Sequence, residues 1–149
     1  MKQKHVAANQ VGIPESDYLY IKESQLPASG RGLYTAVTLY KDEEITVFKG
    51  DVISEKQITK RISEGEDKYF ISLLNGRILD CMHTECFAKY ANDAVGYASA
   101  TFTNNAKIII NEQNEVCLMA VKKIKAGEEI FCGYGKRYWK KHLIKEVEI

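Results

Sequence analysis

The stretch AGEEIFCGYGKRYW, from Ala126 to Trp139, is the most informative part of the sequence. Its apolar run, residues 130–132, is typical of a short buried strand. Tyr134 follows between two glycines, which carry no side chain to cover it and permit turns that other residues resist. A phenol presented on such a turn, at the end of a buried strand, is a candidate catalytic hydroxyl. The alternative is a core tyrosine beside a turn.

Composition limits the classes of protein to which the chain can belong. It has 149 residues, of which 45% are hydrophobic and 28% charged, and a formal net charge of +1. These values are typical of one globular domain, and the small net charge gives no field that favours nucleic acid or anionic membranes. No apolar run approaches the ~20 residues of a membrane span. Residues 1–17 lack the apolar core of a secretory signal and are predicted to form a flexible arm.

The four cysteines show no paired spacing. Cys81, Cys86, Cys117 and Cys132 form no CxxC motif. We therefore expect reduced thiols in an intracellular protein and no metal site, with a zinc site as the less favoured alternative.

Short strands separated by turns dominate the expected secondary structure. The run SEKQITKRISEG, residues 54–65, predicts a helix with a capping box formed by Ser54 and Gln57. Residues 141–149 are predicted to form a C-terminal helical tail. Alternating and β-branched runs predict strands at residues 18–21, 33–37, 45–48, 52–53, 69–74, 77–81, 107–110, 116–121 and 130–132. The fold class is therefore mainly β with short helices, arranged as several small sheets.

The glycine pair in Gly30-Arg31-Gly32 does not fit a dinucleotide-binding fingerprint. That fingerprint lies between a strand and a helix and has a third glycine, whereas Thr35 occupies the third position and a predicted strand follows here. The alternative reading is a loop that only needs positive φ.

Several blocks in a fixed order resemble the SET domain of protein lysine methyltransferases. The resemblance covers residues 18–140. It rests on SGRGLYTA (29–36), EEITVFKGDVIS (43–54), KYFISL (68–73), ILD (78–80), AKYANDA (88–94) and IKAGEEIFCGYGKRYW (124–139). AKYANDA is the loosest match, because it lacks the histidine and cysteine of the family motif. The cysteine-rich flanking modules that bind zinc in many members are also missing. The resemblance implies a SET fold with a C-terminal pseudoknot that places Asn92 beside Tyr134.

The resemblance also implies a cofactor, S-adenosylmethionine. The backbone of Gly30, Arg31 and Gly32 is expected to lie against it, and Asn92 to hydrogen-bond its methionine moiety. Asp93 replaces a histidine that contacts the adenine mainly through its backbone. Tyr138 or Trp139 is expected to cover the adenine face.

For catalysis, the resemblance implies that Tyr134 aligns the methyl group and that Tyr69 forms part of the lysine channel. Cys132, Tyr97 and Phe102 are the candidate substrate-binding residues, although core packing is an alternative for Tyr97 and Phe102. Family members with tyrosine at the position of Cys132 favour single methylation. The smaller cysteine predicts a dimethyl or trimethyl product.

Together these features predict a protein-lysine N-methyltransferase that acts on a protein or peptide lysine, with a histone tail as one candidate. A histone substrate implies the nucleus, and another substrate implies the cytoplasm. We expect no direct nucleic-acid or membrane binding, and the sequence leads to no prediction of oligomeric state. The alternative is a catalytically weak SET-like module that binds a peptide without modifying it. A nucleic-acid binder is less favoured because the net charge is near zero.

Overall fold

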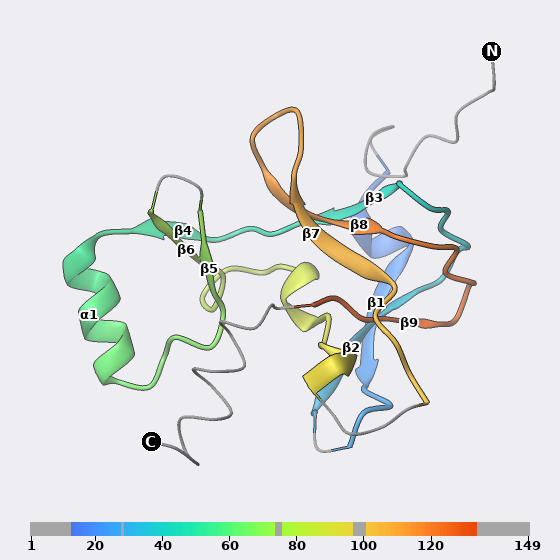
Figure 1. Ribbon diagram of the computed structural model, residues 1–149, viewed down its shortest axis with the longest axis horizontal. Helices are drawn as coiled ribbons and strands as arrows, with labels where there is room; N and C mark the ends of the chain where they lie inside the picture. Colours follow the sequence, from blue (N-terminus) through green and yellow to red (C-terminus); the bar gives the residue numbers. More distant parts are fainter. Residues whose placement is uncertain (1–12, 28, 74–75, 97–100, 134–149) are drawn as a thin grey trace.

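Small antiparallel sheets make up most of the molecule. The computed structural model describes residues 13–27, 29–73, 76–96 and 101–133. Within these residues there are three three-stranded sheets, one α-helix and three short 3-10 helices (Figure 1). The strands are β1 (Leu19–Glu23), β2 (Arg31–Thr35), β3 (Glu44–Val47), β4 (Asp51–Ile53), β5 (Phe70–Ser72), β6 (Ile78–Asp80), β7 (Ala106–Ile110), β8 (Val116–Ala120) and β9 (Glu129–Ile130). The helices are η2 (Glu15–Asp17), α1 (Glu55–Ser63), η3 (Ala88–Tyr90) and η4 (Ala94–Gly96). This confirms the predicted fold class.

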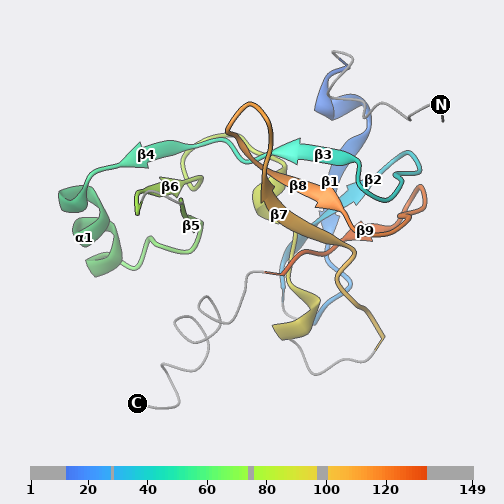
Figure 2. The same cartoon turned by 45° about the horizontal axis from the view of Figure 1, so that its top comes forward.

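Each sheet joins a hairpin to one further strand. The strand orders are β1-β2-β9, β3-β8-β7 and β4-β6-β5, and all strand pairs are antiparallel. The first two sheets form the body of the molecule, while β4, β5, β6 and α1 form a lobe at one end (Figures 1 and 2). The main core contains residues from both parts, among them Leu33, Ile45, Leu118 and Ile130 in the body and Leu79 in the lobe.

The helix of the lobe forms as the sequence predicts. The Ser54 side chain accepts a hydrogen bond from the backbone N–H of Gln57, and the Gln57 side chain accepts one from the backbone N–H of Ser54. Gly65, just beyond the helix, has a φ of +74°, which suits a glycine at the end of a helix. No α1 residue is fully buried. The helix is instead tied to the sheet by an ion pair between Arg61 Nη1 and Asp80 Oδ2, 2.6 Å apart.

The predicted start of one strand is wrong. The predicted strand at 33–37 begins two residues earlier, so Arg31 and Gly32 lie inside β2 rather than in a loop before it. Backbone pairing with β1 decides this, because Gly32 lies opposite Lys22 in the register. The last residues of the predicted N-terminal arm also contain η2, where Glu15 forms an ion pair with Lys49 (3.5 Å). The predicted helical tail, residues 141–149, lies outside the described residues.

The aperiodic segment 82–105 returns to the centre of the body. Asn92 forms a parallel bridge with Phe131, and Ala106 forms one with Cys132. The backbone N–H of Cys132 donates to the Asn92 carbonyl (2.9 Å). The stretch that follows β9 therefore runs between two segments that precede it by about 40 and 26 residues in the sequence. In the described part of the chain, no helix is both long and apolar enough to cross a membrane.

Candidate active site

Three motif segments that are far apart in the sequence meet beside β2. The Asn92 side chain donates from Nδ2 to the backbone carbonyl of Arg31 (3.0 Å), 61 residues earlier. Its own backbone carbonyl is held by Cys132 N–H, as described above. These two contacts bring the segments 30–32, 92–93 and 131–133 together. We call this region the motif corner.

The two glycines of the corner serve different purposes. Gly30 has a φ of +71°, a conformation that side-chain-bearing residues rarely adopt, and among the described residues no atom beyond its chain neighbours lies within 4 Å of the place where a Cβ would stand. Gly32 has no such constraint on φ, but a Cβ there would overlap the Glu129 carboxylate. Gly30 therefore leaves space beside the chain. Gly32 allows an acidic side chain to pack directly against the backbone of β2.

Glu129 is the residue of the corner that sequence analysis missed. Its side chain is buried, and it accepts hydrogen bonds from Ser24 Oγ (2.6 Å), the backbone N–H of Gln25 (2.9 Å) and the hydroxyl of Tyr34 (3.3 Å). Ser24 and Gln25 begin the loop that leads to Gly30. A carboxylate buried beside an apolar strand is costly unless it is hydrogen-bonded, so Glu129 and this loop hold each other in place. A signal was available, since Glu129 directly precedes the apolar run that begins at Ile130.

The same carboxylate affects Tyr34. Burial, together with the adjacent Glu129, raises the pKa of Tyr34 to about 12. The phenol also donates to the Glu23 carbonyl (2.7 Å) and its ring stacks on Tyr20 with 5.5 Å between centroids. Tyr34 is therefore a neutral hydrogen-bond donor at physiological pH, and its position in β2 links Glu129 to β1.

Asp93 is buried and hydrogen-bonded within the protein. Its Oδ1 accepts from the backbone N–H of Val95 and from Asn104 Nδ2, both at 2.9 Å, and the residue is 2% exposed. Asn104 in turn accepts from the backbone N–H of Ala94 (2.8 Å). The carboxylate that replaces the family histidine thus supports η4 and the segment around residue 104. A backbone contact of Asp93 with a ligand is compatible with this arrangement.

The candidate channel residues that the structure describes pack against the core. Tyr69 is half-buried against the main core, with the ammonium groups of Lys68 and Lys89 5.3 and 5.4 Å from its ring centroid. Cys132 is fully buried in the same core, and burial raises the pKa of its thiol. Phe102 packs on Phe131 with 5.4 Å between centroids, in a smaller cluster with Leu26 and Ala94. The structure thus places Cys132 in the motif corner and Phe102 at its edge.

The other candidate residues, Tyr97, Tyr134, Tyr138 and Trp139, lie outside the described residues. Their roles stay predictions.

The described residues of the corner fit a ligand with the chemistry of an amino acid. Within the described part of the chain, nothing donates a hydrogen bond to Asn92 Oδ1, so this acceptor is available to an ammonium group. The space beside Gly30 lets a ligand approach the backbone closely. A metal site is not found in the same way, because no group of three or more His, Cys, Asp or Glu among the described residues is placed to hold a metal ion.

Comparison with known proteins shows to which family these motifs belong. The sequence profile of the SET domain matches residues 30–135. The histone-lysine N-methyltransferase EZH2 of Chaetomium thermophilum is 28% identical over 126 residues, which cover 78% of this chain and 8% of that protein.

Solved structures of similar proteins share the fold of this chain. A chain of "ctPRC2 in an autoinhibited conformation bound to S-adenosylmethionine" superposes with a TM-score of 0.66 and 26% identity, covering 87% of this chain and 17% of that chain. A humanized mutant of the Chaetomium thermophilum Polycomb Repressive Complex 2, bound to the inhibitor GSK343, gives 0.67 and 27%, covering 83% of this chain and 16% of that chain. The chain therefore spans less than a fifth of each of these relatives.

Proposed function

The chain belongs to the SET-domain family, and from this premise we propose that it is a protein-lysine N-methyltransferase that uses S-adenosylmethionine. One observation carries the proposal. The Asn92 side-chain amide donates a hydrogen bond to the Arg31 carbonyl, and the Asn92 backbone carbonyl accepts one from the Cys132 N–H. Residues that match three family motifs therefore lie together at one place in the fold.

Asn92 and the Gly30 turn are the residues we assign to cofactor binding. When bound, S-adenosylmethionine supplies an electrophilic methyl group on a positively charged sulfur. In our proposal Asn92 Oδ1 accepts from the ammonium of its methionine moiety, and the chain at residues 30–32 lies against the ligand through its backbone. Asp93 contributes only its backbone, because its side chain is engaged with Val95 and Asn104.

The protein also has to receive a lysine amine without its proton. With a reference pKa near 10.4, holding that amine neutral at pH 7 costs roughly 4.6 kcal/mol. Desolvation in an apolar channel lowers this cost, and so does the repulsion of a nearby positive charge. We assign the wall of that channel to Tyr69, Cys132 and Phe102, with Tyr97 and Tyr134 as further members. Alignment of the reacting atoms is the remaining contribution, and we assign it to the Tyr134 hydroxyl.

The substrate class we propose is a lysine in a protein, with histones as the first candidate. Support comes from the relative named histone-lysine N-methyltransferase and from the Polycomb Repressive Complex 2 chains with which this fold superposes. If histones are the substrate, the protein acts in the nucleus; a different protein substrate is compatible with the cytoplasm.

Transfer of label tests the proposal. The protein is incubated with S-adenosylmethionine labelled in its methyl group, together with histones and, separately, a cell extract. We expect label on protein lysine with the wild type and roughly 5- to 150-fold less with Asn92→Ala, because lost hydrogen bonds of this kind cost about 1–3 kcal/mol. Label on no protein, with a peptide nevertheless bound, would favour the binding-module alternative.

Two further variants test the finer assignments. Tyr134→Phe is expected to abolish most transfer while cofactor affinity, measured by calorimetry, stays the same. For the product, mass spectrometry after prolonged turnover is expected to show dimethyl or trimethyl lysine, shifted toward monomethyl in Cys132→Tyr. Exclusive monomethylation by both proteins would refute the role of Cys132 in product choice.

A further inference from the structure

Cys81 begins a tight turn, and Cys86 lies two residues beyond the end of that turn. The turn follows β6 and is closed by a hydrogen bond from Thr84 N–H to the Cys81 carbonyl (3.4 Å). Both cysteines are free and buried, and both belong to the main core. The two thiols lie close enough for each to shift the pKa of the other. Cys117 and Cys132 are also buried but have no thiol neighbour of this kind.

The turn is held closed by a cation. The Lys89 ammonium donates to the backbone carbonyls of Cys81 (3.2 Å), Met82 (3.1 Å) and Thr84 (3.1 Å). Three carbonyls of the turn thus converge on one nitrogen, which fixes the backbone between the two cysteines. The backbone from Cys81 to Thr84, most of the segment that joins the two cysteines, is therefore held in one conformation.

The environments of the two thiols differ. Cys86 Sγ accepts a hydrogen bond from the backbone N–H of Lys49 (3.3 Å), and in its neutral form its S–H points to the Val47 carbonyl (3.8 Å). Donation from Cys81 and from backbone N–H groups lowers the pKa of Cys86 to about 6, whereas the pKa of Cys81 is raised. Since the thiolate is the reactive form, Cys86 is suited to react with an oxidant first, and Cys81 is suited to react with the oxidised Cys86.

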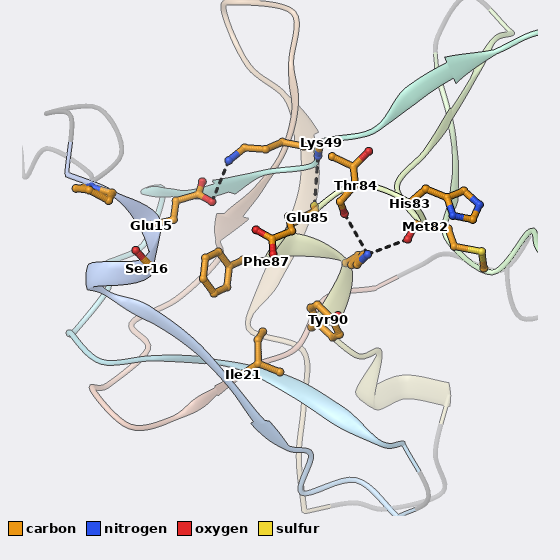
Figure 3. Close-up of a pocket in the computed structure, with 13 residues that line it drawn as sticks. Glu15, Ser16, Ile21, Lys49, Met82, His83, Thr84, Glu85, Phe87 and Tyr90 are labelled. Atoms are coloured by element: carbon orange, nitrogen blue, oxygen red, sulfur yellow. Dashed lines mark hydrogen bonds and ion pairs between the residues drawn. The ribbon is translucent and has the colours of Figure 1, made fainter.

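Cys86 is also the member of the pair that a small molecule can approach. It lines an open pocket of about 760 Å³, whose walls include Glu15, Lys49, His83 and Tyr90 (Figure 3). Lys49 and Lys89, which contact Cys86 and the turn respectively, also line this pocket. Cys81, with no exposed surface, lies behind.

We propose that Cys81 and Cys86 are a site of reversible disulfide formation, oxidised by a hydroperoxide that enters through this pocket. The Cys86 thiolate attacks one peroxide oxygen, the O–O bond breaks, and sulfenic acid and water form when the oxidant is hydrogen peroxide. The Cys81 sulfur then attacks the sulfenic sulfur, forming the S–S bond and releasing a second water. Two thiols lose two electrons, the peroxide gains them, and both thiol protons end in water. A dithiol reductant reverses the reaction through thiol–disulfide exchange.

The inference does not rest on the proposed function, because its evidence is chemical and local. The competing interpretation is that these are inert core cysteines. Cys117 is the internal control: it is equally buried, on β8, and burial raises the pKa of its thiol to about 12. An inert pair would react no faster than Cys117.

Mass spectrometry of the intact wild-type protein, treated with a small excess of hydrogen peroxide, tests the proposal. We expect a loss of about 2 Da, reversed by dithiothreitol, and a proteolytic peptide in which Cys81 and Cys86 are linked. Cys117→Ser should lose the same mass at the same rate, and Cys86→Ser should lose none. In Cys81→Ser, Cys86 should be trapped by dimedone as a sulfenic acid. The proposal is overturned if the wild type shows no mass loss, or if Cys86 is oxidised to sulfinic acid without linking to Cys81. Both results come from the wild type, so they hold even if a variant fails to fold.

Discussion

Two buried carboxylates, one in the body and one in the lobe, are stabilised in different ways. Glu129 in the body accepts hydrogen bonds from neutral groups only, and within the described residues no cation pairs with it. Asp80 in the lobe forms an ion pair with Arg61, and its second oxygen accepts from the backbone N–H of Met82 (3.0 Å). Ser24 and Gln25, which donate to Glu129, lie on the loop that leads to Gly30. The partner of Asp80 lies on α1, far from the motif corner.

This difference separates stability from ligand binding. Removing Arg61 leaves a charge without its partner in the lobe, which is costly for the free energy of unfolding. Removing Glu129 leaves neutral donors without an acceptor, which costs less but loosens the loop of the motif corner. Lobe variants should therefore change stability alone, while corner variants should change both stability and cofactor affinity.

Arg61→Ala is expected to give the largest loss of stability. Removing one partner of a buried ion pair costs about 3–5 kcal/mol, and the Asp80 side chain has no exposed surface. Urea unfolding measures the loss. Lys60→Ala is the matched control, because its i,i+4 pair with Glu64 is exposed and contributes at most about 0.5 kcal/mol. Equal midpoints for the two variants would show that the Arg61–Asp80 pair contributes nothing.

Glu129→Ala is expected to follow, at about 2–4 kcal/mol, because several donors lose their acceptor. Unlike Arg61→Ala, it should also weaken binding of S-adenosylmethionine, measured by calorimetry at a temperature where the variant remains folded. Glu128→Ala is the control: Glu128 is exposed, and its carboxylate accepts a hydrogen bond from the backbone N–H of Lys125 (2.7 Å). An unchanged affinity in Glu129→Ala would limit this residue to a role in stability.

The two glycines of the corner should respond unequally to alanine. Gly32→Ala forces a methyl group against the Glu129 carboxylate and should cost about 1–3 kcal/mol, as overpacked cores do. Gly30→Ala meets no atom and should cost only about 1 kcal/mol, from its positive φ. In a Glu129→Ala background the cost of Gly32→Ala should shrink, since the two residues are in contact. Additive costs in the double variant would contradict the overlap.

Ser54→Ala is expected to have the smallest effect, a loss of about 1 kcal/mol typical of an N-cap residue. The helix is exposed and remote from the motif corner, so cofactor affinity should not change. Thermal unfolding and calorimetry on the same variant check both statements. A weakened affinity would mean that the lobe and the corner are coupled.

Local sequence signals predicted much of this architecture. The capping box of α1 and the hairpin of β7 and β8 are formed by residues near one another in the sequence, so pattern and propensity were sufficient. The roles of Gly32 and Glu129 were not accessible in this way, because the partners of Glu129 in the loop lie 104 and 105 residues away. The start of β2 was misplaced for a similar reason: pairing with β1 overrides the preference of glycine for loops. That the Asp93 carboxylate is hydrogen-bonded within the protein was also inaccessible from local signals, because one of its donors, Asn104, lies 11 residues away.

The central claim is that the motif corner, and not the lobe, binds S-adenosylmethionine. Titration of the isotope-labelled protein with S-adenosylmethionine, followed by amide chemical shifts in NMR, tests it most directly. The account predicts that the amides of Gly30, Arg31, Gly32 and Asn92 shift with a common saturation curve, and that those of α1, Glu55–Ser63, stay in place. Shifts centred on α1, or an absence of shifts in the motif corner at saturating ligand, would contradict it.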